Sequence, residues 1–169
     1  FVDDPCNRCH GTGRGKSNRS VQARIPAGVK DGTKIRLKGK GGPGERGGPG
    51  GDLFVKVSVK PHPLYERKGD NLSVKVPVTF AEAALGADIA IPVPRGGTVN
   101  VRIPAGTTTG RTFRIKGKGV RGKDGLNHDV LAVIDIAVPQ KLTDEAESAL
   151  KAFAEATMDQ DPRKEIYAL

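Results

Sequence analysis

The sequence predicts a mainly β protein: two similar small subdomains, each sandwich- or barrel-like, in an elongated arrangement that ends in a C-terminal helix. Three observations lead to this fold class. A stretch of 21 residues occurs twice, apolar and polar residues alternate along several short runs, and Gly (23) and Pro (12) are frequent in a chain of 169 residues. Alternation is typical of strands with one buried face, and Gly and Pro are typical of the turns between them.

The duplicated stretch reads VQARIPAGVKDGTKIRLKGKG over 21–41 and VNVRIPAGTTTGRTFRIKGKG over 99–119, and 12 of its 21 positions are identical. Each copy alternates, turns at Pro-Ala-Gly and alternates again, so each predicts two strands joined by a turn. We expect five segments: a cysteine-containing remnant (1–19), an incomplete first β-subdomain (20–62), a second β-subdomain (63–141), a C-terminal helix (142–158) and a tail (159–169).

Alternation also places the individual strands. The first copy predicts a strand over 21–25 in which Val21, Ala23 and Ile25 share one face. Further strands are expected over 53–60, 71–80 and 130–138, and two more around a Gly-Gly hairpin within 87–104. A short helix is expected at 81–86, ended by Gly86.

A longer helix is predicted to begin at Thr143, which is a good N-cap residue followed by acidic residues, and to end near Met158. Its apolar residues recur at helical spacing and form one stripe: Ala146, Ala149, Leu150, Phe153 and Ala154. Such a stripe either packs on its own subdomain or pairs with a second copy of the chain.

The formal net charge of +9 raises the question of an anionic partner. The basic residues are spread over turns and strand faces without interleaved aromatic residues, which favours an ordinary basic surface. A basic nucleic-acid-binding β module is therefore the alternative hypothesis. No apolar run approaches 18 residues, so neither a membrane span nor a membrane partner is expected. No nucleophile or acid–base constellation accompanies the three histidines, so we do not expect an enzyme.

The N-terminal segment contains CNRCHGTG over 6–13. Two thiols spaced C-x-x-C suit half of a tetrahedral zinc site. The same letters also match a c-type haem attachment or a dithiol redox site, and two free thiols are the remaining interpretation. So few cysteines, and an N-terminus without signal-peptide features, favour a reducing, cytoplasmic location.

The pattern C-x-x-C-x-G-x-G, the first repeat copy, GGDLFVKVSVKPHPLYERKGDNL and VPVTFAEAALGADIAIP follow one another in this chain. In this order they resemble the C-terminal half of class A DnaJ-type co-chaperones, over nearly the whole sequence. Members of that family also have a J-domain, a Gly/Phe-rich linker and further cysteine repeats. The chain is therefore interpreted as a fragment that begins inside the last cysteine repeat and lacks J-domain activity.

In this family two cysteine repeats together bind each zinc ion. The resemblance therefore implies that Cys6 and Cys9 are half of a zinc site in the parent protein. Because the other two ligands are not in this sequence, zinc is not expected here unless another chain completes the site.

The resemblance further implies binding of unfolded polypeptides by strand addition beside a hydrophobic pocket, followed by delivery to a DnaK-type ATPase chaperone. The positions that match the pocket are Val21 and Val55, with Ala23, Ile25 and Leu53 as neighbours. The resemblance also favours a homodimer formed through Ala146, Leu150 and Phe153. A purely structural, dimerising spacer is a third hypothesis.

Overall fold

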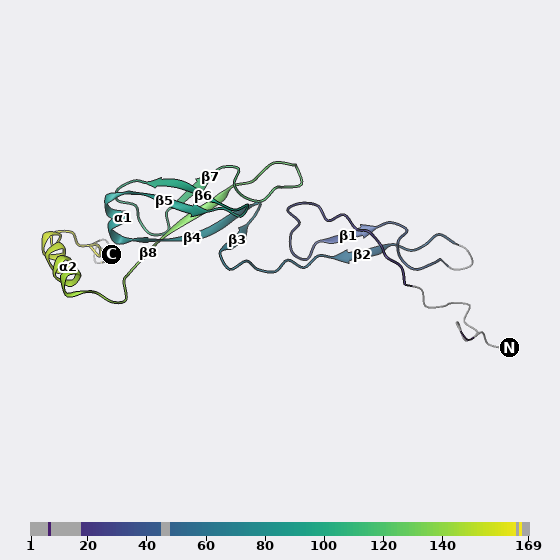
Figure 1. Cartoon of the computed structure of the whole chain (residues 1–169), viewed down its shortest axis with the longest axis horizontal. Helices are drawn as coiled ribbons and strands as arrows, with labels where there is room; N and C mark the ends of the chain where they lie inside the picture. Colours follow the sequence, from purple (N-terminus) through teal and green to yellow (C-terminus); the bar gives the residue numbers. More distant parts are fainter. Residues whose placement is uncertain (1–6, 8–17, 45–47, 165, 167–169) are drawn as a thin grey trace. The chain divides into compact units, whose positions relative to one another are not determined.

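The computed structural model of the chain describes residue 7, residues 18–44 and 48–164, and residue 166. These residues form eight strands and two helices (Figure 1). In chain order the elements are β1 (Lys34–Leu37), β2 (Leu53–Lys56), β3 (Tyr65–Lys68), β4 (Asn71–Thr79), α1 (Phe80–Leu85), β5 (Ala87–Pro92), β6 (Thr98–Ile103), β7 (Thr112–Ile115), β8 (Val130–Ala137) and α2 (Asp144–Ala156). The prediction of a mainly β chain with a C-terminal helix is confirmed.

Three sheets join these strands within the described residues. β1 pairs with β2, β5 pairs with β6, and four strands follow the order β3-β4-β8-β7. The chain divides into two compact units. The first unit takes Phe1–Ser73 with Ile115–Val130, and the second takes Val74–Arg114 with Leu131–Leu169. No helix among the described residues is long and apolar enough to cross a membrane.

The core of the second unit is built on alternating β-branched residues. In β4 the side chains of Val74, Val76 and Val78 are buried, whereas Lys75 and Pro77 between them are exposed. Ile91, Ile103 and Ile134 of β5, β6 and β8 are almost completely buried and complete this core. An aliphatic core is what a chain with 4% aromatic residues must use.

Local signals set the bounds of α1. Thr79 caps the helix: its hydroxyl accepts a hydrogen bond from the Glu82 N–H, and the Glu82 carboxylate accepts one from the Thr79 N–H. At the other end Gly86 adopts a φ of 83° and donates its N–H to the Glu82 carbonyl, 2.9 Å away. A side chain at Gly86 would lie 3.0 Å from the Ile103 carbonyl, so glycine is required there.

The repeat is also seen in how the second half of each copy is hydrogen-bonded. The Gly39 N–H donates to the Asp52 carboxylate at 2.8 Å, and the Gly117 N–H donates to the Asp129 carboxylate at 2.9 Å. Each aspartate immediately precedes a strand, β2 or β8. The two Lys-Gly-Lys-Gly turns are therefore closed in the same way, and β1–β2 corresponds to β7–β8.

The first halves of the two copies differ in secondary structure. In the second copy, 99–103 belongs to β6, which pairs with β5 from Ala87↔Ile103 to Pro92↔Thr98. The strand expected over 21–25 is not formed, so that prediction is wrong for this structure. Within the described residues no strand pairs with 21–25, and a strand without a partner leaves its backbone groups unpaired. The strand expected over 53–60 is shortened to β2, although the Val57 backbone beyond its end still hydrogen-bonds with Gly32 and Thr33.

Candidate functional site

The β1–β2 hairpin brings two of the predicted peptide-binding residues together. In its antiparallel register Val55 lies opposite Ile35 and Leu53 opposite Leu37. All four side chains are half-buried and, by the alternation of the strands, share one face. This face is a small apolar surface of aliphatic residues, which is the chemistry expected of a site for apolar side chains.

The other three predicted residues lie outside any strand. Val21 is half-buried, whereas Ala23 and Ile25 are exposed, and 55% of Ile25 is accessible to solvent. The structure thus brings Leu53 and Val55 onto one face and places Val21, Ala23 and Ile25 in an irregular segment before the first Pro-Ala-Gly turn.

The opposite face of the hairpin carries a residue that the sequence reasoning did not single out. Phe54 is 61% exposed and lines a hollow of about 460 Å³ together with Lys34 and Lys56. Arg36 lies opposite Phe54 in the register. The signal was present in LFVK, where alternation places the aromatic residue on the face of the lysines.

The end of the hairpin is held by Asp52. Its carboxylate accepts hydrogen bonds from the Gly39 N–H at 2.8 Å and from the Arg36 Nε at 2.5 Å. The Gly39 hydrogen bond, followed by that of Arg36, holds the pKa of the Asp52 carboxyl below its usual value. The ionised aspartate therefore keeps the Lys38-Gly39-Lys40 turn closed directly beside Leu53.

Helix α2 carries the predicted dimerisation residues. The Thr143 hydroxyl accepts a hydrogen bond from the Ala146 N–H, as the predicted cap requires. Ala146 is half-buried, but no residue of α2 is fully buried; Leu150 remains 45% exposed and Phe153 46% exposed. Phe153 packs edge to face on Phe80, with 5.4 Å between the ring centroids. The apolar stripe is therefore only partly covered by its own chain.

The predicted zinc half-site falls outside the described residues, because Cys6 and Cys9 both belong to the part of the chain whose placement is not given. In the part that is described, no three His, Cys, Asp or Glu residues cluster as metal ligands would. Zinc binding by this chain stays a prediction.

Comparison with known proteins supplies the family. The family model described as the DnaJ C terminal domain matches residues 8–139. The chain is 53% identical to "Chaperone protein DnaJ 1" of Streptomyces avermitilis over 167 residues, which cover 99% of this chain and 42% of that protein. It is 56% identical to "Chaperone protein DnaJ 1" of Streptomyces coelicolor over 180 residues, covering 98% of this chain and 45% of that protein.

A third relative, "Chaperone protein DnaJ 2" of Cutibacterium acnes, is 54% identical over 176 residues and is matched over 46% of its length. The chain thus spans less than half the length of the curated relatives that it matches. The family match covers most of the chain. It agrees with the duplicated β-unit of the structure and with the family that the sequence motifs resemble. The chain belongs to the DnaJ C-terminal domain family.

Proposed function

We propose that this chain is a polypeptide-binding region of a DnaJ-type co-chaperone, and that the β1–β2 hairpin takes an extended segment of an unfolded polypeptide as an added strand. The chain acts by binding and catalyses no reaction. In the parent protein the bound segment is passed on to a DnaK-type ATPase chaperone. This last step is carried over from the family, as is a cytoplasmic location.

The observation that carries the proposal is the aliphatic face of the β1–β2 hairpin. On this face Leu53 lies opposite Leu37 and Val55 opposite Ile35, and all four side chains are half-buried. The face is therefore partly open to an apolar side chain of a bound polypeptide.

The two parts of the site have separate roles. Backbone hydrogen bonds to β2 are independent of the client's sequence, so they suit a partner that binds many unfolded chains. Leu53 and Val55, with Val21, Ala23 and Ile25 as further proposed contacts, supply an aliphatic surface for one client side chain. Each fully buried aliphatic side chain contributes about 1.5–3 kcal/mol, so binding by one such site is weak and reversible.

A homodimer through α2 would offset this weakness. Leu150 and Phe153 are half exposed, and we propose that with Ala146 they pack against the same stripe of a second copy. Two linked weak sites bind one long unfolded chain more tightly than either site alone.

The site is tested with Val55→Asp and an apolar, neutral peptide carrying a fluorophore. A carboxylate on the aliphatic face disfavours an apolar side chain there, so we expect peptide anisotropy to rise at much higher protein concentrations than with the unaltered chain. Val55→Thr preserves the side-chain shape and should weaken binding by a smaller factor, which guards against misfolding of the first variant.

Val138→Asp is the matched control, because Val138 is 75% exposed and lies after β8 in the second unit. It introduces the same charge and should leave peptide binding unchanged. Equal binding by Val55→Asp, Val138→Asp and the unaltered chain would rule out the hairpin face as the client site.

We also propose that Cys6 and Cys9 are half of a four-cysteine zinc site of the parent protein. Paired C-x-x-C thiols have the spacing of such a half-site. Titration of the isolated chain with zinc should then give no site of tight, stoichiometric affinity, whereas the parent protein should retain zinc after dialysis. Loss of zinc from the parent protein under the same dialysis would contradict this assignment.

A second candidate function is the binding of single-stranded nucleic acid. The exposed Phe54 beside Lys34 and Lys56 combines a stacking surface with two cations, as such sites do. Phe54→Ala should then weaken the binding of a short oligonucleotide, and that binding should fall steeply with salt. Absence of binding at low salt would eliminate this candidate without affecting the first.

A further inference from the structure

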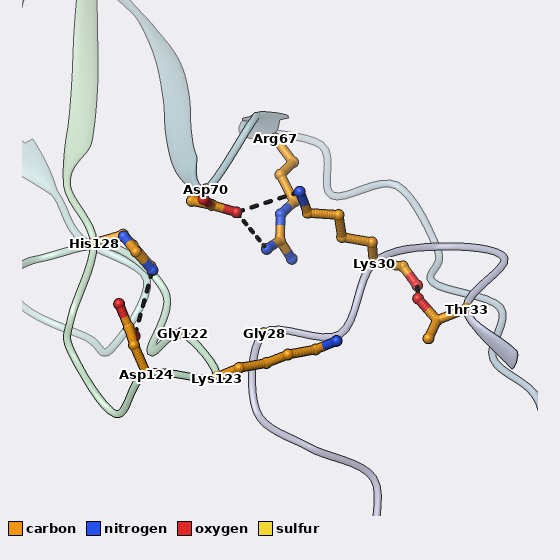
Figure 2. A pocket seen from close by; sticks show the side chains of 9 residues that line it. All are labelled: Gly28, Lys30, Thr33, Arg67, Asp70, Gly122, Lys123, Asp124 and His128. Atoms are coloured by element: carbon orange, nitrogen blue, oxygen red, sulfur yellow. Dashed lines mark hydrogen bonds and ion pairs between the residues drawn. The ribbon is translucent and has the colours of Figure 1, made fainter. Parts of the chain in front are cut away.

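A cluster of charged side chains in the first unit lies around a hollow of about 350 Å³ (Figure 2). Its walls come from the turn after the first Pro-Ala-Gly, from the β3–β4 turn and from the loop before β8. Six ionisable residues line it: Lys30, Arg67, Asp70, Lys123, Asp124 and His128.

A glycine allows two walls of the hollow to approach. A Cβ atom at Gly28 would lie 2.6 Å from the Arg121 carbonyl oxygen. Because this contact is with the main chain, the first Pro-Ala-Gly turn and the loop over 121–128 meet backbone to backbone at Gly28. Gly122 lies beside the side chains of Asp124 and His128 in its own loop.

Most of the charges in the hollow already have partners. The Asp70 carboxylate lies 3.3 Å from the Lys30 Nζ and 3.9 Å from an Arg67 guanidinium nitrogen. Arg67 also donates to the Val29 carbonyl at 3.2 Å. The Lys30 ammonium, with smaller contributions from His128 and Arg67, holds the pKa of the Asp70 carboxyl below its usual value.

Lys123 differs from these residues. Its side chain points across the hollow toward the segment that carries Gly28 (Figure 2). No hydrogen bond or ion pair to another described residue holds its ammonium, while Asp124 beside it pairs instead with His128, whose Nε2 lies 3.8 Å away. The hollow therefore contains one cation in excess of its carboxylates.

We propose that this hollow is an acceptor site for one carboxylate group of a bound polypeptide, held by Lys123 with Arg67 and Lys30 at its side. The ligand is a side-chain carboxylate of Asp or Glu, or a C-terminal carboxylate. The ligand class rests on the proposed function, whereas the position and the charge of the site do not.

The charge balance of the lysines, the arginine and the aspartates suits a carboxylate. Apart from His128, which lies beside Asp124, the cations Lys30, Arg67 and Lys123 oppose Asp70 and Asp124, so one carboxylate balances the charges of these five residues. A phosphate group carries between one and two negative charges at neutral pH and would leave an excess beside the two aspartates.

The site is tested on the whole 169-residue chain at low ionic strength by following the backbone amide signals of Gly28 and Gly122 in two-dimensional NMR. Three short peptides serve as probes: one with a single internal Glu and both ends blocked, one with a free C-terminal carboxylate as its sole charge, and one that is neutral. Saturable shifts with the first or the second peptide support the site and identify the source of the carboxylate. No saturable shift with either, or equal shifts with the neutral peptide, overturns it.

Lys123→Gln should weaken binding of the effective probe about fivefold, the scale of a solvent-accessible ion pair, and Lys123→Arg should restore it. Lys118→Gln is the control, since it removes the same charge from the neighbouring turn outside the hollow. Unchanged affinity of Lys123→Gln overturns the proposal.

The proposed peptide site on the hairpin is tested independently of the hollow. Val55→Asp should abolish binding of an apolar neutral peptide and leave the shifts that the carboxylate probe causes at Gly28 unchanged. If the apolar peptide never binds while the carboxylate probe does, the hairpin function is wrong and the hollow remains a carboxylate site.

Discussion

Truncation of Phe153 to alanine tests whether α2 joins two copies of the chain. Phe153 is 46% exposed. An aromatic side chain has about 200 Å² of surface, so about 90 Å² remains to be covered by a partner. At about 25 cal/mol per Å², this area corresponds to about 2 kcal/mol in each protomer.

A two-fold symmetric dimer contains the change twice, so the loss is at most about 4 kcal/mol. The alanine methyl group retains part of the contact, and we expect a loss of about 2–4 kcal/mol. The dissociation constant should then rise about 30- to 1,000-fold.

Sedimentation velocity or light scattering across a dilution series measures this constant directly. Lys151→Ala is the control, because Lys151 lies on the polar side of α2, where its Nζ pairs with Glu147 at 2.7 Å. This variant should keep the mass of the unaltered chain at every concentration. If Phe153→Ala also keeps that mass, or if the unaltered chain is monomeric throughout, the stripe does not form a dimer.

Three further predictions concern stability. Ile103→Ala empties a site that is 1% exposed and should lower the free energy of unfolding by about 3 kcal/mol in a urea titration; a loss below about 1 kcal/mol would contradict the placement of the core. Thr143→Ala removes the cap of α2 and should cost about 1 kcal/mol, visible as lower helical circular dichroism, whereas Thr143→Ser should cost little. Asp52 has a lowered pKa in the folded chain, so it stabilises the fold above its unfolded pKa of 3.8 and loses this effect as the pH falls through the folded value. Asp52→Asn should therefore be less stable at neutral pH and lose less stability below about pH 4 than the unaltered chain; parallel pH profiles would refute this.

Much of the second unit could be predicted from the sequence because its signals are local. Thr79 and Glu82 form a capping box within four consecutive residues, and Gly86 ends the helix with a positive φ. The Gly-Gly pair at 96–97 turns the β5–β6 hairpin. Each of these features depends on the conformational preferences of a few neighbouring residues and does not require tertiary contacts.

The candidate peptide site was less predictable. Alternation placed Leu53 and Val55 on one face, and the structure confirms this. It also shows that Leu53 lies opposite Leu37 and Val55 opposite Ile35. The same alternation in Val21, Ala23 and Ile25 did not produce a strand, although the equivalent residues of β6 form one. Alternation indicates which face a strand would bury but does not provide the partner that hydrogen-bonds it.

The sequence by itself determined that the chain is built from a duplicated β-unit, and the structure adds that an aspartate closes the Lys-Gly-Lys-Gly turn of each copy in the same way. Only the tertiary structure decided which copies of a strand are paired, and that Lys30, Arg67 and Lys123 meet around one hollow. The physical reason is the range of the interactions. Caps and turns act between near neighbours in the chain, whereas strand pairing and charge clusters join segments that lie far apart in sequence and meet only after the chain has folded.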